Sequence, residues 1–218
     1  MRRRAGAVNA AMAGARARDR SRVYKLCSLL LQYPTPEIVA AREELAAAAA
    51  EDLPETEALV ARYGRAPLAE LQEEYVRTLD FDRRASLHLT YHTHGDRRQR
   101  GLELVRLKRR FAEAGLAPSD RELPDYLPVL LEFAALAPER GEPLLAELRG
   151  PLELVRSRLH ETESPYAVVL DAILGRLPKL TAEQAEAVRR LALEGPPSEL
   201  VGLEPFGAES DFVPEGAR

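Results

Sequence analysis

Apolar residues recur at three- and four-residue intervals through most of the chain, which is the spacing of one face of an α-helix. Between Ser21 and Gln32 they fall on one face, and Tyr33-Pro34 ends the pattern. Similar helical patterns cover residues 36–50, 67–79, 97–114, 125–137, 143–160, 165–177 and 182–194, and a shorter one ends before Gly64. We therefore predict an all-α fold, a compact single-domain bundle of many helices.

Residues 80–94 fit this pattern less well. Leu87, Leu89 and Tyr91 alternate with other residues, as they would in a strand, but no neighbouring segment offers a partner strand. Strand-forming residues are also scarce, because the chain holds two isoleucines and no tryptophan. We therefore predict a helix here as well.

Capping and breaking residues mark several helix ends. Thr181 and Gln184 have the spacing of a capping box at the start of the last helix. Gly115 is expected at the C′ position of the helix predicted over residues 97–114, and a left-handed backbone is common at that position. Gly150-Pro151 should kink the helix of residues 143–160.

The composition is that of one domain with two atypical ends. Of the 218 residues, 45% are hydrophobic and 30% are charged, so one sizeable core can be buried. Residues 1–20 are rich in arginine, and we expect a disordered basic extension or a translation start placed too early. Residues 196–218 are rich in glycine, proline and acidic residues and are expected to form a loose tail. The helical domain is therefore assigned to residues 21–195, between these two ends.

Charge and cysteine content exclude several classes of protein. Cys27 is the only cysteine, which rules out an intrachain disulfide and a thiolate zinc site and favours a reducing compartment. The longest mostly apolar run, Leu127 to Ala137, is far shorter than the roughly 20 residues of a membrane span. With a net charge of −4, the whole chain does not have the charge of a nucleic-acid binder.

One segment is nevertheless densely basic. Apart from Arg100, its cations are Arg97, Arg98, Arg106, Lys108, Arg109 and Arg110. On a helix they spread around most of the circumference outside the apolar stripe of Leu104, Leu107 and Phe111. Such a spread is typical of a solvated face, and no aromatic platform is interleaved with the charges. We therefore expect no nucleic-acid binding.

Three of the four histidines lie between positions 88 and 94. His88 and His92 are four residues apart and would share one face of a helix, a spacing that can serve a metal. A metal-dependent hydrolase using His88, His92 and His94 is therefore one alternative, although the metalloprotease pattern H-E-x-x-H is absent. We favour polar or interfacial histidines near a helix end, with no metal, no cofactor and no catalytic residue.

Arg100 lies on the apolar stripe of its helix. A guanidinium in that position needs a carboxylate or carbonyl partner. Asp125 and the Glu73-Glu74 pair are candidates. The alternative is an arginine whose head group reaches solvent at the edge of the stripe.

The helix that follows Pro124 has two different faces. One suits the core and carries Leu127, Leu130, Leu131 and Ala134. The other mixes apolar residues with two acids and carries Asp125, Val129, Glu132, Phe133 and Leu136. This second face could accept an amphipathic helix that bears arginine or lysine, or it could pack on a neighbouring helix of the same chain.

These residues also carry a resemblance to a known family. His94-Gly95-Asp96, Arg100-Gly101 and Glu122 to Pro128 are spaced as in the delta-subunit assembly chaperones of respiratory nitrate reductase, the NarJ family. Tyr33-Pro34 and the block from Glu163 to Val168 are placed as in that family. The resemblance extends from about residue 21 to residue 193 and lies within the TorD-like superfamily of helical molybdoenzyme chaperones.

The resemblance implies a TorD/NarJ-like fold and a cytoplasmic protein that catalyses nothing. Such a chaperone binds the apo catalytic (alpha) subunit of nitrate reductase, mainly its N-terminal segment, with the alpha–beta complex as a further candidate partner. It promotes molybdenum cofactor insertion before membrane assembly and is not part of the final enzyme. We expect a monomer or weak homodimer without stable membrane association. The alternative is a chaperone that proofreads the signal peptide of another molybdoenzyme of the DMSO reductase family.

The family motif and the mixed face together predict a client-binding set. Its members are His94, Gly95, Asp96, Arg100, Glu122, Leu123, Pro124, Asp125, Tyr126, Leu127, Pro128, Val129, Glu132 and Phe133. Tyr126 departs from the family, which often has histidine there, although tyrosine can still stack and donate a hydrogen bond. We expect that Asp125→Lys together with Glu132→Lys weakens client binding while the fold survives.

Overall fold

The computed structural model describes residues 19–95, 98–119 and 121–194. Within these ranges the regular elements are helices, apart from an isolated antiparallel bridge between His88 and Tyr126. The all-α prediction is therefore confirmed. Most of the predicted basic extension and the acid-rich tail lie outside the described residues, but residues 19 and 20 already belong to the first described helix, residues 19–30.

The elements follow one another in two groups. After the helix of residues 19–30, the first group is α2 (Pro36–Ala40), α3 (Arg42–Asp52), η1 (Pro54–Thr56), α4 (Glu57–Arg65), α5 (Leu68–Tyr75), the π-helical turn η2 (Val76–Asp80) and η3 (Arg83–Ala85). The second is α6 (Leu89–His94), α7 (Arg98–Glu113), α8 (Leu127–Leu136), α9 (Pro138–Glu147), α10 (Arg149–Glu161), α11 (Ala167–Arg176) and α12 (Ala182–Glu194).

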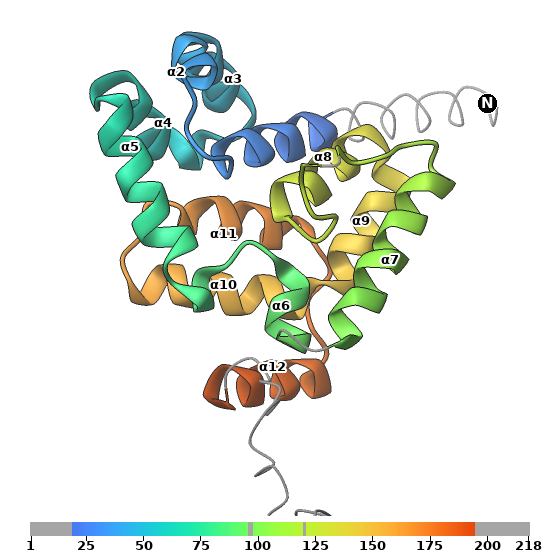
Figure 1. The fold of residues 1–218 in the computed structure, drawn as a ribbon. Helices are drawn as coiled ribbons and strands as arrows, with labels where there is room; N and C mark the ends of the chain where they lie inside the picture. Colours follow the sequence, from blue (N-terminus) through green and yellow to red (C-terminus); the bar gives the residue numbers. More distant parts are fainter. Residues whose placement is uncertain (1–18, 96–97, 120, 195–218) are drawn as a thin grey trace, which may run out of the picture.

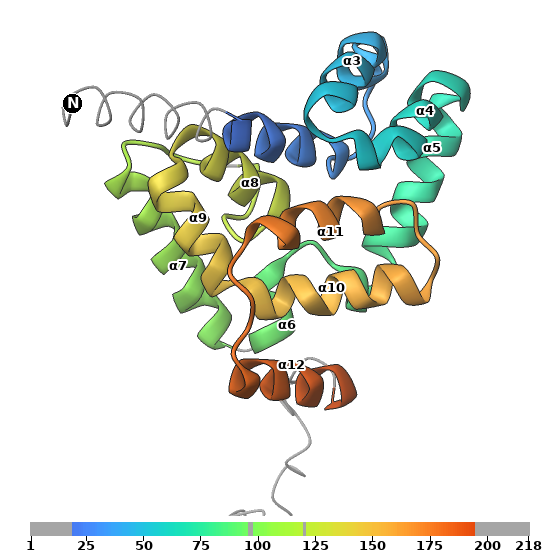
Figure 2. The same ribbon diagram turned by 180° about the vertical axis from the view of Figure 1, so that it is seen from behind.

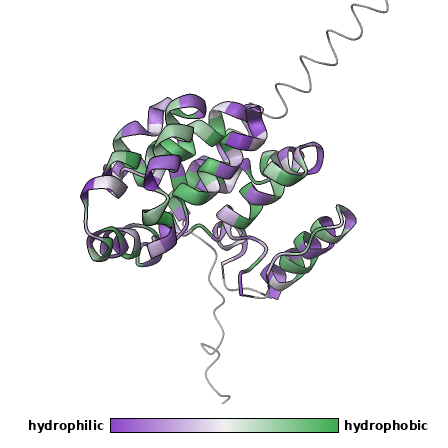
Figure 3. Cartoon of the chain, turned by 90° about the horizontal axis from the view of Figure 1, so that it is seen from above, coloured by the Kyte–Doolittle hydropathy of each residue, from purple (hydrophilic) through white to green (hydrophobic). Residues whose placement is uncertain are grey.

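The helices pack around a centre made by α10 and α11, which run side by side in Figures 1 and 2. α7, α8 and α9 lie on one side of this pair, and α2 to α5 lie on the other. Most helices carry hydrophobic residues on one side and hydrophilic residues on the other, as Figure 3 shows. α8 and α11 are buried on most of their surface, which explains why their sequences are so apolar.

The prediction of one helix over residues 80–94 is wrong. Asp82 caps the short η3 by accepting a hydrogen bond from the Arg84 backbone N–H (3.0 Å). The chain then runs extended, and the Leu127 N–H donates to the Leu87 carbonyl (2.8 Å). The Leu89 N–H donates to the Asp125 carbonyl (3.0 Å). The alternation of apolar residues thus reflects a short extended segment whose partner lies far away in the sequence.

Other predicted helix bounds also differ from the structure, and the helix expected over residues 36–50 is two helices, α2 and α3, with Ala41 between them. The single kinked helix expected over residues 143–160 is two helices, α9 and α10, with Leu148 between them. Pro151 lies in the first turn of α10, where backbone N–H groups have no acceptor within the helix, so a proline there costs no helical hydrogen bond. α4 continues through Gly64 and ends at Arg65, two residues before a proline.

The capping predictions are confirmed because they depend on local geometry alone. The Thr181 N–H donates to Gln184 Oε1 (2.9 Å), and the Gln184 N–H donates to Thr181 Oγ1 (3.2 Å). This reciprocal pair is the predicted capping box of α12. Gly115 has φ 73° after the end of α7, as expected of a C′ glycine.

Cys27 is expected to be an unreactive thiol in the folded protein. Its side chain is fully buried on the helix of residues 19–30, and burial raises its pKa to about 12, so almost no thiolate is present at neutral pH. Iodoacetamide labelling followed by mass spectrometry should be slow in buffer and fast in denaturant. Rapid labelling of the native protein would contradict the buried position.

Candidate functional site

A groove with a volume of about 410 Å³ lies along α8. It is lined by Gln32, Tyr33, Thr35, Phe111, Leu116, Ala117, Pro118, Ser119, Glu122, Tyr126, Pro128, Val129, Glu132, Phe133 and Leu136. The second face of α8 that the sequence predicts is thus the face that borders this groove. Six members of the predicted client-binding set line it, namely Glu122, Tyr126, Pro128, Val129, Glu132 and Phe133.

The end of α7 provides one side of the groove. After Gly115 the chain turns back, and the Leu116 N–H donates to the Phe111 carbonyl (3.0 Å), the bond of a Schellman motif. Phe111 packs on Phe133 of α8 with ring centroids 4.5 Å apart and the planes inclined by 49°. Both rings are almost fully buried, so they form an apolar floor.

The helix of residues 19–30 borders α8 at the groove. Ser28 Oγ donates a buried hydrogen bond to the Pro128 carbonyl (2.9 Å), which joins this helix to the first turn of α8. Lys25, one turn before Ser28, forms an ion pair with Glu132, one turn after Pro128. Tyr33, just after the helix, is 42% exposed at the rim of the groove. The groove is therefore bordered by segments about 100 positions apart in sequence.

Tyr126 connects the groove to the interior. Its hydroxyl lies 2.8 Å from the Tyr75 hydroxyl, and Tyr75 in turn donates to the Leu31 carbonyl (3.0 Å). The Tyr126 ring also lies 5.2 Å from the His88 ring, measured between centroids. Tyr126 thus packs against His88 and takes part in a hydrogen bond to Tyr75.

Asp125 is the centre of a buried polar cluster. Its Oδ2 accepts hydrogen bonds from Thr90 Oγ1 (2.5 Å) and Arg100 Nη2 (3.3 Å), and its Oδ1 lies 3.1 Å from His88 Nδ1. Burial opposes ionisation of this carboxyl, but the hydrogen bonds from His88 and Thr90 and the charges of His88 and Arg100 outweigh it. The pKa of Asp125 therefore lies below its usual value, and the cluster holds an ionised carboxylate.

This cluster confirms one prediction and corrects another. Arg100 pairs with Asp125, as its position on the apolar stripe suggested. The placement of Asp125 on the open face of α8 is wrong, because its side chain is fully buried and α8 begins only at Leu127. The double charge reversal at Asp125 and Glu132 would therefore break the cluster, so we now expect it to destabilise the fold as well as change the groove.

The remaining members of the predicted set do not meet at the groove. Gly95, Pro124 and Leu127 are buried, and Leu127 belongs to the core. His94 is half-buried at the end of α6, and Leu123 is exposed. Asp96 lies outside the described residues. Sequence reasoning did not find the groove residues of the segments before α2 and after α7, although Tyr33-Pro34 and Gly115 marked the turns that bring them there.

The histidines do not form the shared face that the hydrolase alternative requires. His88 precedes α6 and is bonded to Asp125, whereas the buried His92 has its Nε2 2.8 Å from the Ser86 carbonyl. Burial is the main reason that the pKa of His92 is lowered, which favours its neutral form. Across the part of the chain that the structure describes, no three His, Cys, Asp or Glu residues are grouped as metal ligands.

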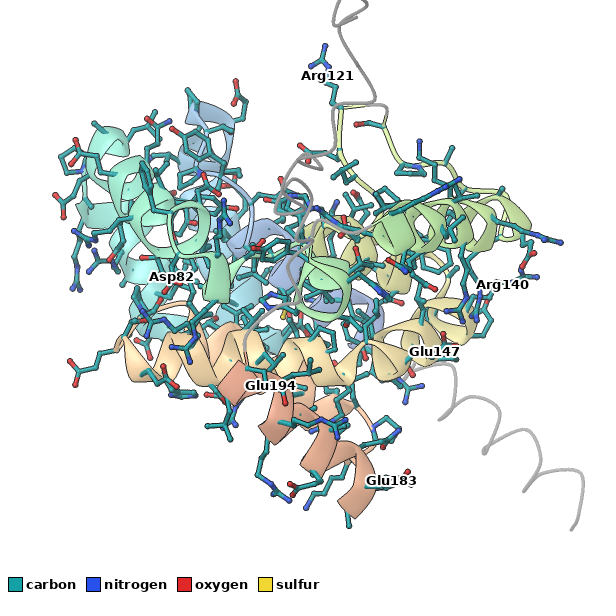
Figure 4. The ribbon with its side chains drawn as sticks, turned by 60° about the horizontal axis from the view of Figure 1, so that its bottom comes forward. Asp82, Arg121, Arg140, Glu147, Glu183 and Glu194 are labelled. Carbon is teal, nitrogen blue, oxygen red and sulfur yellow. The ribbon has the colours of Figure 1, made fainter. Side chains whose placement is uncertain are left out.

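The basic residues of α7 form the predicted charged outer surface. Arg106 and Arg110 both donate to Glu147 of α9, which is labelled in Figure 4, and Arg109 pairs with Glu113. Arg106, Lys108 and Arg109 are exposed. Within the described ranges, no helix has both the length and the hydrophobicity that crossing a bilayer demands.

Comparison with known proteins identifies the family. The family model described as "Nitrate reductase delta subunit" matches residues 42–171. A Bacillus subtilis (strain 168) protein named "Probable nitrate reductase molybdenum cofactor assembly chaperone NarJ" is 31% identical over 184 residues, covering 77% of this chain and 94% of that protein. The "Nitrate reductase molybdenum cofactor assembly chaperone NarJ" of Escherichia coli (strain K12) is 34% identical over 157 residues, covering 68% of this chain and 66% of that protein.

A solved structure has the same fold. The crystal structure of a candidate redox enzyme maturation protein from Archaeoglobus fulgidus superposes with a TM-score of 0.56, covering 71% of this chain and 91% of that chain. The two sequences are 22% identical, so this likeness concerns the fold alone. The family match and the identity across most of the Bacillus subtilis protein lead to one conclusion: the chain belongs to the nitrate reductase delta subunit family.

Proposed function

We propose that this protein is a molybdenum cofactor assembly chaperone for a nitrate reductase. It binds the apo catalytic subunit, mainly through that subunit's N-terminal segment, and keeps it competent for cofactor insertion before membrane assembly. The observation that carries the proposal is the groove along α8, an apolar hollow with acidic residues, in a chain whose relatives are named as such chaperones.

The chemistry of the groove suits a short amphipathic segment. Its floor is the Phe111–Phe133 pair, and Val129 and Leu136 add apolar surface, with Leu136 65% exposed. Its volume of about 410 Å³ is in the range that accommodates a few large side chains. Glu122 and Glu132 supply negative charge at the same groove. A helix with an apolar face and neighbouring lysine or arginine residues would complement both features.

Holding a client in this way needs no reacting group. The Asp125 cluster has a different task, because its side chains bind one another beneath the surface and join the segment before α8 to α6 and α7. We propose that it fixes the position of α8 and thereby shapes the groove. In this account the chaperone acts in the cytoplasm as a monomer or weak dimer and leaves the reductase before the enzyme is complete.

Val129→Arg is expected to weaken binding of a peptide with the N-terminal sequence of the nitrate reductase catalytic subunit by about tenfold or more. The half-buried Val129 lines the groove, so an arginine would fill the hollow and place a cation where the peptide docks. Isothermal titration calorimetry measures the effect. Val105→Arg is the matched control, because Val105 is a 67% exposed valine on α7 that does not line the groove.

Two results would argue against the proposal. Equal affinity of wild type, Val129→Arg and Val105→Arg would show that the peptide does not use the groove. A thermal-shift panel with leader peptides of other molybdoenzymes provides the second check. Stabilisation by such a leader, with none by the nitrate reductase peptide, would assign the chaperone to a different client.

A further inference from the structure

An internal ion pair lies beside the groove and uses Glu132, the acid that a cationic client would bind. Glu132 lines the groove from α8, and Lys25 reaches it from the helix of residues 19–30. Lys25 itself does not line the groove. Glu132 is therefore shared between two sides, with the ammonium of Lys25 on one and the open groove on the other.

The position of Lys25 is set by the packing of the two helices. The buried hydrogen bond from Ser28 to the Pro128 carbonyl fixes where the helices meet. Lys25 lies one helical turn before Ser28, and Glu132 lies one turn after Pro128. The ion pair therefore forms one turn away from the Ser28–Pro128 hydrogen bond, along the same helix–helix contact. Both side chains are nearly half exposed, at 46% and 45%, so the lysine can turn into solvent without unfolding the helix.

We propose that Lys25 is a built-in competitor for the cationic group of the client and sets the charge selectivity of the groove. This inference rests on the proposed function. A client lysine or arginine gains Glu132 only when Lys25 releases it, so one ion pair is exchanged for another. A client segment without a cation leaves the Lys25–Glu132 pair intact and has nothing to displace. Lys25 thus weakens the binding of basic segments and narrows their advantage over neutral ones.

Replacing Lys25 by methionine should sharpen this selectivity. Methionine keeps much of the apolar stem but leaves Glu132 free for the client. A peptide with the N-terminal sequence of the nitrate reductase catalytic subunit should bind about two- to fivefold more tightly, the range expected for one exposed ion pair. The same peptide with its lysines and arginines replaced by glutamine should show no gain, because it cannot replace the lost partner of Glu132.

The control variants separate a local effect from a change in net charge. Lys108→Met removes one positive charge from the exposed surface of α7, away from the groove, and should leave the affinity for the basic peptide unchanged. Glu132→Gln should weaken binding of the basic peptide, and the double variant Lys25→Met/Glu132→Gln should bind no more tightly than Glu132→Gln alone. Such a cycle isolates the coupling between the two positions.

The outcomes distinguish this inference from the function on which it rests. If wild type binds the basic peptide but Lys25→Met binds it equally or more weakly, the competitor role is overturned and the proposed function stands. An equal gain with Lys108→Met also overturns the role, because the effect is then general electrostatics. If wild type and Lys25→Met both fail to bind, the proposed function and the inference fall together.

Discussion

Gly141→Ala is expected to destabilise the protein by about 2 kcal/mol. Gly141 lies on α9 where this helix crosses α8, and a Cβ atom there would be 2.3 Å from Ala134 Cα and 2.7 Å from Ala134 N. Backbone atoms cannot yield as a flexible side chain would, so the two helices must move apart. The loss outweighs the gain of up to about 1 kcal/mol that alanine brings to a helix. Urea unfolding followed by circular dichroism measures the change.

Gly101→Ala is the matched control. Gly101 lies within α7, and a Cβ atom there would meet nothing within 4 Å. The substitution should therefore raise stability by about 0.5–1 kcal/mol through helix propensity alone. If both variants shifted the unfolding midpoint in the same direction and by the same amount, the close crossing of α8 and α9 would be refuted.

Asp125→Asn is expected to cost about 3 kcal/mol of stability. Asparagine keeps the shape of the side chain but removes the charge that compensates Arg100, whose side chain is 19% exposed. The matched control is Asp171→Asn. Asp171 also pairs with an arginine and a histidine, Arg156 and His160, but its side chain is 37% exposed. An exposed cluster of this kind contributes about 1 kcal/mol or less.

Urea unfolding measures the cost of each variant, and the pH dependence of unfolding tests the ionised state of Asp125. The folded-state pKa of Asp125 is lowered, so its contribution to stability is present above the unfolded-state value of about 3.9. That contribution is lost as the pH falls through the folded-state pKa. Stability of the wild type should therefore decline in acid, and Asp125→Asn should flatten this part of the curve. An unchanged acid limb in Asp125→Asn would contradict the buried ionised carboxylate.

The pattern of the sequence distinguished the two faces of α8 but left open whether the second face is covered by a neighbouring helix. Val129, Glu132 and Leu136 recur at three and four residues, and this spacing alone puts them on one side of a helix. Asp125 was assigned to the same face because the helix was expected to begin there. In the structure the first turn holds Pro128, and the residues before it pair with the backbone around Leu87.

What the sequence did not indicate is long-range pairing. The bridge between His88 and Tyr126 joins two short extended segments that α6 and α7 separate along the chain, so no hairpin turn marks them as partners. The same limit explains the missed wall of the groove. Gln32, Leu116 and Pro118 lie in segments between helices, and only the packing of the helix of residues 19–30 and α7 on α8 brings these segments together. Caps such as Thr181 with Gln184 were predictable because both partners lie within one turn.

Site-specific photocrosslinking is the most direct test of the central claim, that the groove holds the N-terminal segment of the catalytic subunit. A photoreactive amino acid is placed at Val129 in the groove or at Val105 on the outer face of α7. Each protein is irradiated with the apo catalytic subunit, and the crosslinked peptides are identified by mass spectrometry. The account predicts crosslinks from position 129 to the N-terminal segment and none from position 105. Crosslinks from position 105 to that segment, with none from position 129, would contradict it.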